Sequence, residues 1–130
     1  MASEDLSHTI RLNPKSGDAY FNRALVYEVL ENHQRAIEDY SQVIQFNPKA
    51  AKYYNKRAAA YDAIGKHRLA VLDYSQSIRL NPKDPDIYEL RAYTYFKLGQ
   101  TELACEDLRM KCKLDHCYRS IEKMSNGKCK

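Results

Sequence analysis

The chain of 130 residues has no tryptophan, only four glycines and four prolines, and no cysteine before position 105. It has no apolar run near the roughly 18 residues that a membrane-spanning helix needs, and its first ten residues, MASEDLSHTI, lack the apolar stretch of a signal peptide. Hydrophobic residues make up 44% of the chain and charged residues 29%, as in ordinary globular proteins. We therefore expect one globular architecture with no membrane insertion, in the cytoplasm.

Motifs of catalysis and cofactor binding are missing as well. The sequence has no glycine-rich loop to cradle a phosphate and no paired-carboxylate motif. A catalytic triad needs three groups that converge in one pocket, whereas the four histidines are scattered along the chain at positions 8, 33, 67 and 116. We expect a protein without catalysis, cofactor or bound metal.

Positive charge is concentrated at one end of the chain. Residues 1–108 carry 14 basic and 15 acidic side chains, whereas residues 109–130 carry seven basic and two acidic ones. A basic tail can contact nucleic acid, but no continuous basic face with interleaved aromatic residues accompanies it. The favoured interpretation is a solvated end, and no nucleic-acid partner is expected.

A six-residue string recurs with a period of 34 residues: IRLNPK at 10–15 and 78–83, and the near-copy IQFNPK at 44–49. Rows of 34 that begin at positions 17, 51 and 85 also align small and aromatic residues in columns. These columns are Tyr20, Tyr54 and Tyr88; Ala24, Ala58 and Ala92; Tyr27, Tyr61 and Tyr95; Ala36, Ala70 and Ala104; and Tyr40, Tyr74 and Leu108. The period and the three- and four-residue spacings predict a helical hairpin repeated three times.

The Asn-Pro pair in each string marks the end of a helix, because proline disfavours the helical conformation of the residue before it and lacks an amide proton. Gly65 and Gly99 fall at the turn inside a hairpin, where a helix end often needs a positive φ, and Glu31 takes that place in the first row. First helices are predicted near 18–30, 52–63 and 86–97, and second helices near 34–46, 68–80 and 102–114.

The aligned alanines allow the two helices of a hairpin to approach closely, and the tyrosines fill the space between hairpins. Two further columns place an arginine on each first helix and an aspartate on each second helix. We predict an ion pair across every hairpin, with a structural rather than a catalytic role. The pairs are Arg23 with Asp39, Arg57 with Asp73, and Arg91 with Asp107.

In these columns the chain resembles the tetratricopeptide repeat family. Rows such as AKYYNKRAAAYDAIGKHRLAVLDYSQSIRLNPKD carry the family's order of aromatic, small, Tyr, Gly, Ala, aromatic and Pro positions, over nearly the whole length. The resemblance implies an all-α, right-handed superhelix of antiparallel helix pairs, whose concave face, lined by the first helices, holds peptides or partner proteins. The predicted repeats are 17–50, 51–84 and 85–118, with a leading segment at 1–16 and a C-terminal capping segment at 119–130.

Both ends depart from the repeat. Residues 3–14 align with a second helix, so the chain begins with half a repeat; we expect an excised piece of a longer array, the alternative being a single capping helix. At the other end CKLDHC replaces a fourth IRLNPK, and a short closing helix at 119–124, ended by Asn126-Gly127, is predicted. The string EDLRMKCKLDHCYRSIEKMSNGKC is similar to the ends of some bacterial tetratricopeptide proteins, which close with cysteines around a tyrosine and a final Gly-x-Cys.

The predicted binding groove is formed by the outward positions of the three first helices. These positions combine a positive band with acidic and aromatic ones, which suits a peptide with a negative group and an apolar residue better than a nucleic acid. The predicted residues are Phe21, Asn22, Leu25, Lys52, Asn55, Lys56, Ala59, Glu89, Tyr93 and Phe96.

The family resemblance supplies a sharper alternative, a receptor for the C-terminus of a chaperone. Tetratricopeptide co-chaperones bind the C-terminal carboxylate of heat-shock chaperones with a clamp of lysines, asparagines and an arginine. By position, Asn22 matches the clamp's middle asparagine, and Lys52 and Lys56 match its later lysine and arginine. Lys56 replaces the clamp arginine, so a guanidinium that can bind a carboxylate with two parallel hydrogen bonds is replaced by a single compact ammonium charge. The remaining alternative is a purely structural segment of a longer scaffold.

All four cysteines lie in the last 26 residues, at 105, 112, 117 and 129, without the close CxxC pairs of a zinc site. Reduced thiols are expected for a cytosolic protein, with Cys105 pointing inward as a small core residue. The alternative is a disulfide between Cys117 and Cys129 that staples the closing helix, which implies an exported or periplasmic protein.

Overall fold

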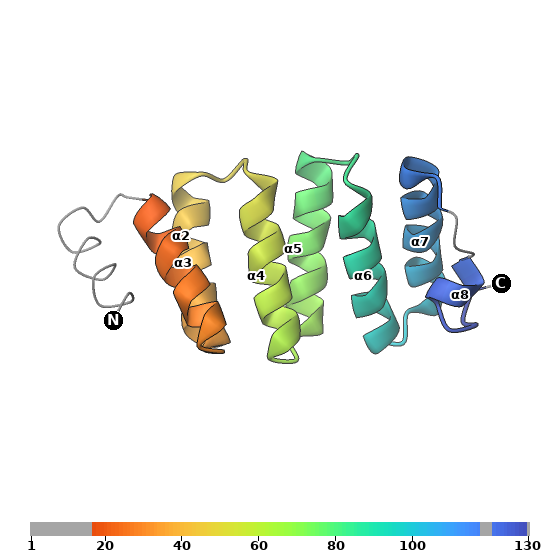
Figure 1. Ribbon diagram of the computed structural model, residues 1–130, viewed down its shortest axis with the longest axis horizontal. Helices are drawn as coiled ribbons and strands as arrows, with labels where there is room; N and C mark the ends of the chain where they lie inside the picture. Colours follow the sequence, from red (N-terminus) through yellow and green to blue (C-terminus); the bar gives the residue numbers. More distant parts are fainter. Residues whose placement is uncertain (1–16, 118–120, 130) are drawn as a thin grey trace.

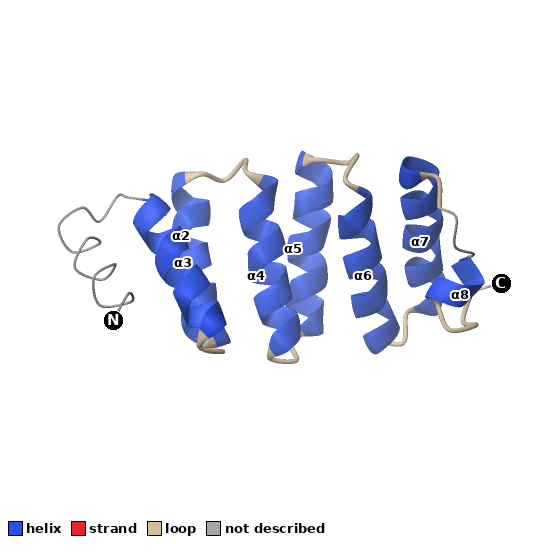
Figure 2. Ribbon diagram, in the orientation of Figure 1, coloured by secondary structure: helices blue, strands red, loops and turns tan. Residues whose placement is uncertain are grey.

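The computed structural model describes residues 17–117 and 121–129 of the chain. Within them the structure is all-helical, a solenoid of helix hairpins with no strand (Figure 2). The helices lie side by side in a row, with α2 and α8 at opposite ends (Figure 1). They are α2 (Gly17–Val29), α3 (His33–Phe46), α4 (Ala51–Ala63), α5 (His67–Leu80), α6 (Pro85–Lys97), α7 (Thr101–Asp115) and α8 (Ile121–Met124). The predicted leading segment at 1–16 lies outside the described residues.

The six hairpin helices begin and end within one residue of their predicted positions. Side-chain caps mark the starts of two of them: the Asn32 side chain accepts a hydrogen bond from the amide of Arg35 at 3.3 Å before α3, and Asp84 accepts one from the amide of Asp86 at 3.1 Å before α6. Pro85 occupies the first turn of α6, where its missing amide hydrogen costs nothing. No proline follows α7, and that helix continues to Asp115.

The turn inside each hairpin has the same backbone geometry. Gly65 and Gly99 have φ values of 80° and 75°, and Glu31 adopts a φ of 58° although it is not a glycine. In every turn the next amide donates to a tyrosine carbonyl of the first helix, at 2.8 Å for Asn32 and Tyr27, and at 2.9 Å for the other two pairs, Lys66 with Tyr61 and Gln100 with Tyr95. The shared hydrogen bond therefore holds Glu31 in a conformation that favours glycine.

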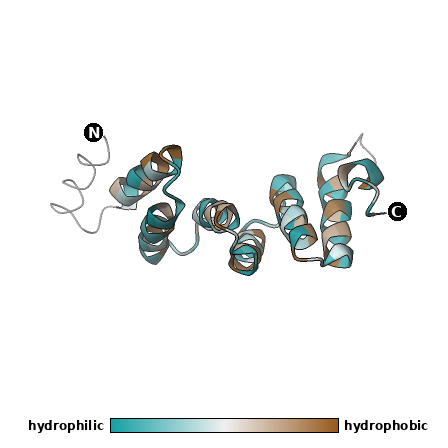
Figure 3. Cartoon of the chain, turned by 90° about the horizontal axis from the view of Figure 1, so that it is seen from below, coloured by the Kyte–Doolittle hydropathy of each residue, from teal (hydrophilic) through white to brown (hydrophobic). Residues whose placement is uncertain are grey.

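The core follows the aligned columns. All six column alanines are fully buried, and Tyr40, Tyr74 and Leu108 are at most 2% exposed. Every helix carries both hydrophilic and hydrophobic residues around its circumference (Figure 3), as helices that bury one face do. Among the described residues no helix is long and apolar enough to cross a membrane.

The structure brings each predicted arginine together with its aspartate in a two-pronged hydrogen bond. The guanidinium nitrogens lie 2.6 and 2.8 Å from the carboxylate in the first hairpin, 2.7 and 2.8 Å in the second, and 2.7 and 2.8 Å in the third. Each guanidinium also lies 5.5 to 5.9 Å from the ring centroids of the two column tyrosines on its own helix. Asp39, Asp73 and Asp107 are buried, so these are desolvated charge pairs rather than surface contacts.

Two kinds of hydrogen bond recur between one hairpin and the next. Arg57 donates a further hydrogen bond to Ser41 of the preceding hairpin at 3.1 Å, and Arg91 does the same to Ser75 at 3.0 Å. The hydroxyls of Tyr54 and Tyr88 donate to the carbonyls of the hinge prolines, Pro48 and Pro82, at 2.9 and 3.0 Å. The Asn-Pro hinge is therefore fixed by the helix that follows it.

The described part of the closing helix, α8, packs onto α7. Met124 and Cys129 share a buried cluster with Cys105 and Leu108 of α7, and Ile121 packs against this cluster. The chain leaves α8 through Asn126 and Gly127, whose φ values of 53° and 82° match the predicted turn. Residues 119 and 120, where this helix was expected to begin, lie outside the described residues.

The cysteine pairing differs from both sequence-based expectations. All four cysteines form disulfides, Cys105 with Cys129 and Cys112 with Cys117, so neither the reduced thiols nor the Cys117–Cys129 bridge is found. Cys129 packs under α8 into the buried cluster that holds Cys105, with their Cα atoms 5.6 Å apart. Cys117 instead lies just beyond the left-handed turn at His116, which brings its Cα within 4.6 Å of that of Cys112.

We expect Asp73→Asn to lower the free energy of unfolding by about 3 kcal/mol, because it leaves the Arg57 charge without its buried counter-ion. Urea unfolding followed by circular dichroism measures the loss. Glu106→Gln, which neutralises an exposed carboxylate on α7, is the control and should change stability little. Loss of ligand binding at unchanged stability would contradict a structural role for the pair.

Candidate functional site

The ten predicted groove residues lie on α2, α4 and α6, and we call the surface that they form the first-helix face. None of the ten is fully buried, so each can contact a ligand. Five are exposed and five are half-buried. The exposed ones are Asn22, Lys52, Lys56, Ala59 and Tyr93, and the half-buried ones are Phe21, Leu25, Asn55, Glu89 and Phe96.

The boundary between α2 and α4 presents positive charge beside aromatic rings. The rings of Phe21 and Tyr53 meet edge to face with centroids 5.2 Å apart. The Lys52 ammonium lies 5.5 Å from the Phe21 centroid and 5.1 Å from that of Tyr53, in the range of a cation–π contact. Within 17–117 and 121–129, neither Lys52 nor Lys56 forms a hydrogen bond or an ion pair. These two charges are therefore available to an acidic partner.

Two side-chain oxygen atoms of α2 and α4 are buried and lack a hydrogen-bond donor in the described part of the chain. They are Oδ1 of Asn55, on α4, and Oε1 of Glu28, one of the outward positions of α2. A buried acceptor without a donor costs free energy. Because both atoms are buried, a ligand N–H group can reach them only after the side chains rotate toward the surface.

The carboxylates at the ends of α2 and α4 are held by histidines of the following helices. Glu28 meets His33 Nδ1 at 3.3 Å, and Asp62 meets His67 Nδ1 at 2.7 Å. Asp62 also accepts a hydrogen bond from the Thr94 hydroxyl of α6 at 2.6 Å. His33 and His67 occupy the same repeat column, in the turn inside the hairpin, which indicates an architectural role. Their carboxylate partners were not predicted. The recurring five-residue spacing between acid and histidine was the signal that could have revealed them.

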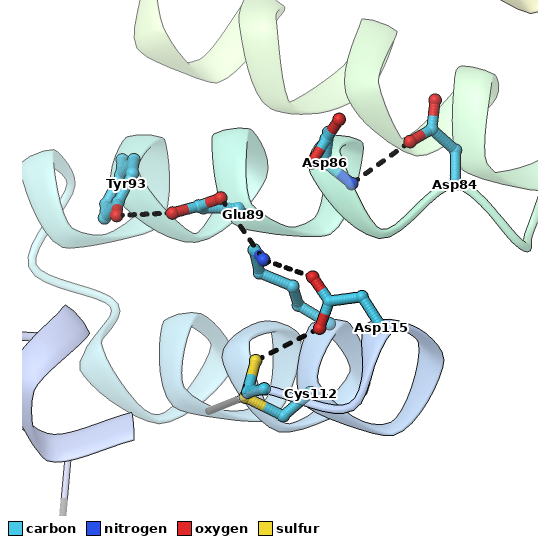
Figure 4. Close-up of polar contacts among 8 residues, drawn as sticks. Asp84, Asp86, Glu89, Tyr93, Cys112 and Asp115 are labelled. Atoms are coloured by element: carbon cyan, nitrogen blue, oxygen red, sulfur yellow. Dashed lines mark hydrogen bonds and ion pairs between the residues drawn. A yellow bond between two sulfur atoms is a disulfide. The ribbon is translucent and has the colours of Figure 1, made fainter. Parts of the chain in front are cut away.

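The α6 end of the face has a different electrostatic character (Figure 4). The Tyr93 hydroxyl donates to Glu89 Oε1 at 2.8 Å, and the Lys111 ammonium of α7 lies 3.7 Å from Glu89 Oε2 and 2.5 Å from Asp115 Oδ2. The hydrogen bond to Asp115 is the main cause that raises the pKa of Lys111, so the amine stays charged. Here the lysine is already paired, unlike those on α4. This network was not predicted, because its residues do not repeat.

No metal centre is assembled by the described residues. None of their histidine, cysteine, aspartate and glutamate side chains form a group of three or more that is placed to hold a metal ion.

Two family models match the sequence. One, described as Tetratricopeptide repeat, covers residues 17–50, and the other, described as TPR repeat, covers residues 63–99. Together they take in more than half of the chain. No curated protein matches the sequence.

Solved structures share this fold at low sequence identity. MamA superposes with a TM-score of 0.87 at 18% identity, over 97% of this chain and 76% of that one. The TPR domain of Arabidopsis OM64 gives 0.77 at 19% identity, over 86% and 93%. The first TPR of Spaghetti (RPAP3), bound to the HSP90 peptide SRMEEVD, gives 0.76 at 21% identity, over 85% and 90%. At these identities the likeness concerns the fold alone.

A pH dependence of stability follows from the tyrosine buried beside Asp62. Burial, and secondarily the charge of Asp62, raises the pKa of Tyr74 to about 12, and burial also raises the pKa of Tyr40. An unfolded tyrosine ionises near pH 10, so the unfolded chain releases this proton first. The stabilising effect is therefore complete below pH 10 and is lost as the pH rises from 10 to 12.

We expect Tyr74→Phe to reduce the alkaline loss of stability between pH 10 and 12 by about 1–2 kcal/mol. Urea unfolding at several pH values measures the slope. The Tyr40→Phe, Tyr74→Phe double variant should flatten the slope further. A wild-type slope retained in both variants would show that other groups dominate the alkaline loss.

Proposed function

Because the chain belongs to the tetratricopeptide repeat family, a family of protein-interaction repeats, we propose that its first-helix face is a non-catalytic binding site for an acidic peptide segment of a partner protein. The observation that carries this proposal is the pair of unneutralised lysines, Lys52 and Lys56, one turn apart on α4. Both are exposed, and Asn22 of α2 is exposed as well. An acidic group that lies across α2 and α4 meets two cations and an amide donor.

The neighbouring contacts favour an extended peptide over a small anion. A peptide backbone carries an N–H group at each residue, and rotation of the half-buried Asn55 and Glu28 side chains would bring their unpaired oxygens within its reach. Phe21 and Leu25 are half-buried beside these polar groups and offer an apolar contact for one side chain of the ligand. The surface thus provides charge, hydrogen bonds and an apolar patch in succession.

A second candidate is the narrower function of a co-chaperone-like receptor for a C-terminal carboxylate. The position of Asn22, Lys52 and Lys56 in the family's clamp pattern favours it, and one structural neighbour, the RPAP3 domain, is bound to a peptide that ends in EEVD. In this chain a lysine takes the place of the clamp arginine, so the ion pair lacks a bidentate geometry. The broader proposal needs only an acidic group, wherever it lies in the peptide.

We expect the peptide SRMEEVD to bind the chain, and the Lys52→Ala, Lys56→Ala double variant to bind it at least about tenfold more weakly. Fluorescence anisotropy with labelled peptide measures both affinities. Lys83→Ala, which removes an exposed lysine at a hinge, is the matched control and should bind like the wild type.

The same titration with a C-terminally amidated peptide separates the two candidates. A large loss of affinity on amidation supports the carboxylate receptor, whereas equal affinity eliminates it and leaves recognition of acidic side chains. Failure of both peptides to bind, or equal binding by the double variant, overturns the proposal and favours a structural segment of a longer array.

We also infer that the protein works in an oxidising compartment, outside the reducing cytosol. The support is that all four cysteines are paired, one pair within the buried cluster of the C-terminal cap. Disulfides persist in exported and periplasmic proteins and are rare where thiol reductants are abundant.

Thiol trapping tests this inference. N-ethylmaleimide is added to intact cells before lysis, and the intact mass of the protein is measured. A second sample is reduced after this step, treated again with N-ethylmaleimide, and measured in the same way. We expect no adduct on the native protein and four after reduction. Four adducts without reduction would place the protein in a reducing compartment.

A further inference from the structure

The two disulfides differ in their access to solvent. Cys105 and Cys129 are 5% and 1% exposed, inside the cluster under α8. Cys112 and Cys117 are half-buried and lie around the exposed left-handed turn at His116. Thiol–disulfide exchange requires a thiolate to reach a sulfur atom. A small thiol therefore reaches the Cys112–Cys117 bond before it reaches the other.

We propose that the Cys112–Cys117 disulfide is a reversible redox site whose state sets the charge that the first-helix face presents at α6. The effect on ligand binding rests on the function proposed above, whereas the change of charge does not. The cognate reductant is a dithiol, either a small molecule or an exposed pair of cysteines on another protein.

A continuous set of contacts connects the disulfide to the face (Figure 4). Asp115, the last residue of α7, has Oδ1 3.1 Å from the sulfur of Cys117 and Oδ2 2.5 Å from the ammonium of Lys111. Lys111 lies 3.7 Å from Glu89 of α6, which accepts the hydrogen bond of Tyr93. The path thus runs from the sulfur, through one carboxylate and one ammonium, to two residues of the first-helix face.

Lys111 is the residue of this path that can pair with either of two carboxylates. Its side chain is only 12% exposed and lies between the carboxylates of Asp115 and Glu89. One cation cannot fully compensate two carboxylates, so its position decides which of them is paired more strongly. In the disulfide form it is 1.2 Å closer to Asp115, at 2.5 against 3.7 Å, so Glu89 is only partly compensated and gives the face more net negative charge.

Reduction by a dithiol is balanced without any further reactant. A thiolate of the dithiol attacks one of the two sulfur atoms and forms a mixed disulfide, and the other cysteine leaves as a thiolate that takes up a proton. The second thiol of the dithiol then displaces the bound cysteine and closes its own disulfide. The dithiol supplies two electrons and two protons, and Cys112 and Cys117 become thiols.

Reduction weakens the hold of Asp115 on Lys111 in two ways. The bridge no longer fixes the turn at His116, a non-glycine residue with a φ of 53°, so this disfavoured conformation can relax and carry Asp115 with it. The new thiol of Cys117 can also donate to Asp115 Oδ1, where the disulfide sulfur carried no hydrogen. Both changes release Lys111 toward Glu89. The oxidised face is therefore more acidic at α6 than the reduced one.

The test is NMR spectroscopy of the ligand-free full chain, oxidised and after mild treatment with dithiothreitol that opens only Cys112–Cys117. Alkylation and peptide mapping identify the pair that has opened. We expect the side-chain signals of Lys111 and the ring signals of Tyr93 to shift on reduction. The Cys112→Ser, Cys117→Ser variant, which keeps the buried disulfide, should reproduce the reduced spectrum without any reductant.

Glu89→Gln interrupts the path and should abolish the redox-dependent shift of Tyr93. Glu102→Gln, on the first turn of α7, is the matched control and should leave that shift intact. Unchanged Lys111 and Tyr93 signals with the pair shown to be open, or earlier reduction of Cys105–Cys129, would overturn the proposal. If the serine variant does not fold, by circular dichroism, the partly reduced wild type still decides the question.

Binding of a tetralysine peptide gives the functional readout. We expect its affinity for the oxidised chain to be about threefold higher than for the reduced chain, because Glu89 is then less strongly compensated by Lys111. Equal affinities would contradict the proposed charge change. Failure of the proposed binding function can be told apart from failure of the redox proposal. In the first case SRMEEVD does not bind in either redox state, but the NMR shifts of the ligand-free chain on reduction are still observed.

Discussion

The half-buried arginine of each first helix makes the contacts on which the rest of the array depends. Arg57 binds the aspartate of its own hairpin and the serine of the preceding one, and Arg91 repeats this arrangement. A single guanidinium has five N–H donors in a rigid fork, so it can hold two second helices in one geometry. The tyrosines on either side of it exclude water and strengthen these bonds. The angle between hairpins, and hence the placement of the first helices, follows from this contact.

The first-helix face that results has two electrostatic halves. On α4 the lysines have no acidic neighbour among the described residues, whereas at α6 the acids of the face are already engaged by Tyr93 and Lys111. The difference arises because the repeat constrains only the residues that pack. The outward positions are free to differ from one row to the next, and they give the face its selectivity.

The sequence predicted the repeated features well because the same packing requirement acts on each of the three rows. A residue type that recurs at one position of every row therefore stands out. Helix boundaries, buried alanines and the proximity of Arg57 to Asp73 could all be read from columns. The serine column was missed because Arg109 interrupts it in the third row. The disulfides were paired wrongly because the C-terminal cap occurs once, and spacing alone does not show that Cys129 folds back beneath α8. The contacts of Lys111 could not be predicted either, because its partners also do not recur from row to row.

The hydrogen bond between Tyr54 and the carbonyl of Pro48, repeated by Tyr88 and Pro82, limits which insertions the chain can accept. Proline and tyrosine are six residues apart in both hinges. One extra helical residue between them would move the tyrosine about 100° around the helix axis, so keeping the hydrogen bond would require the helix to rotate. Such a rotation would turn Lys52 and Lys56 away from α2. Each hinge thus acts as a fixed spacer that keeps successive helices in phase. Substitutions on the first-helix face can therefore change the specificity of the array without disturbing this phase, whereas changes in the length of the hinges disturb it.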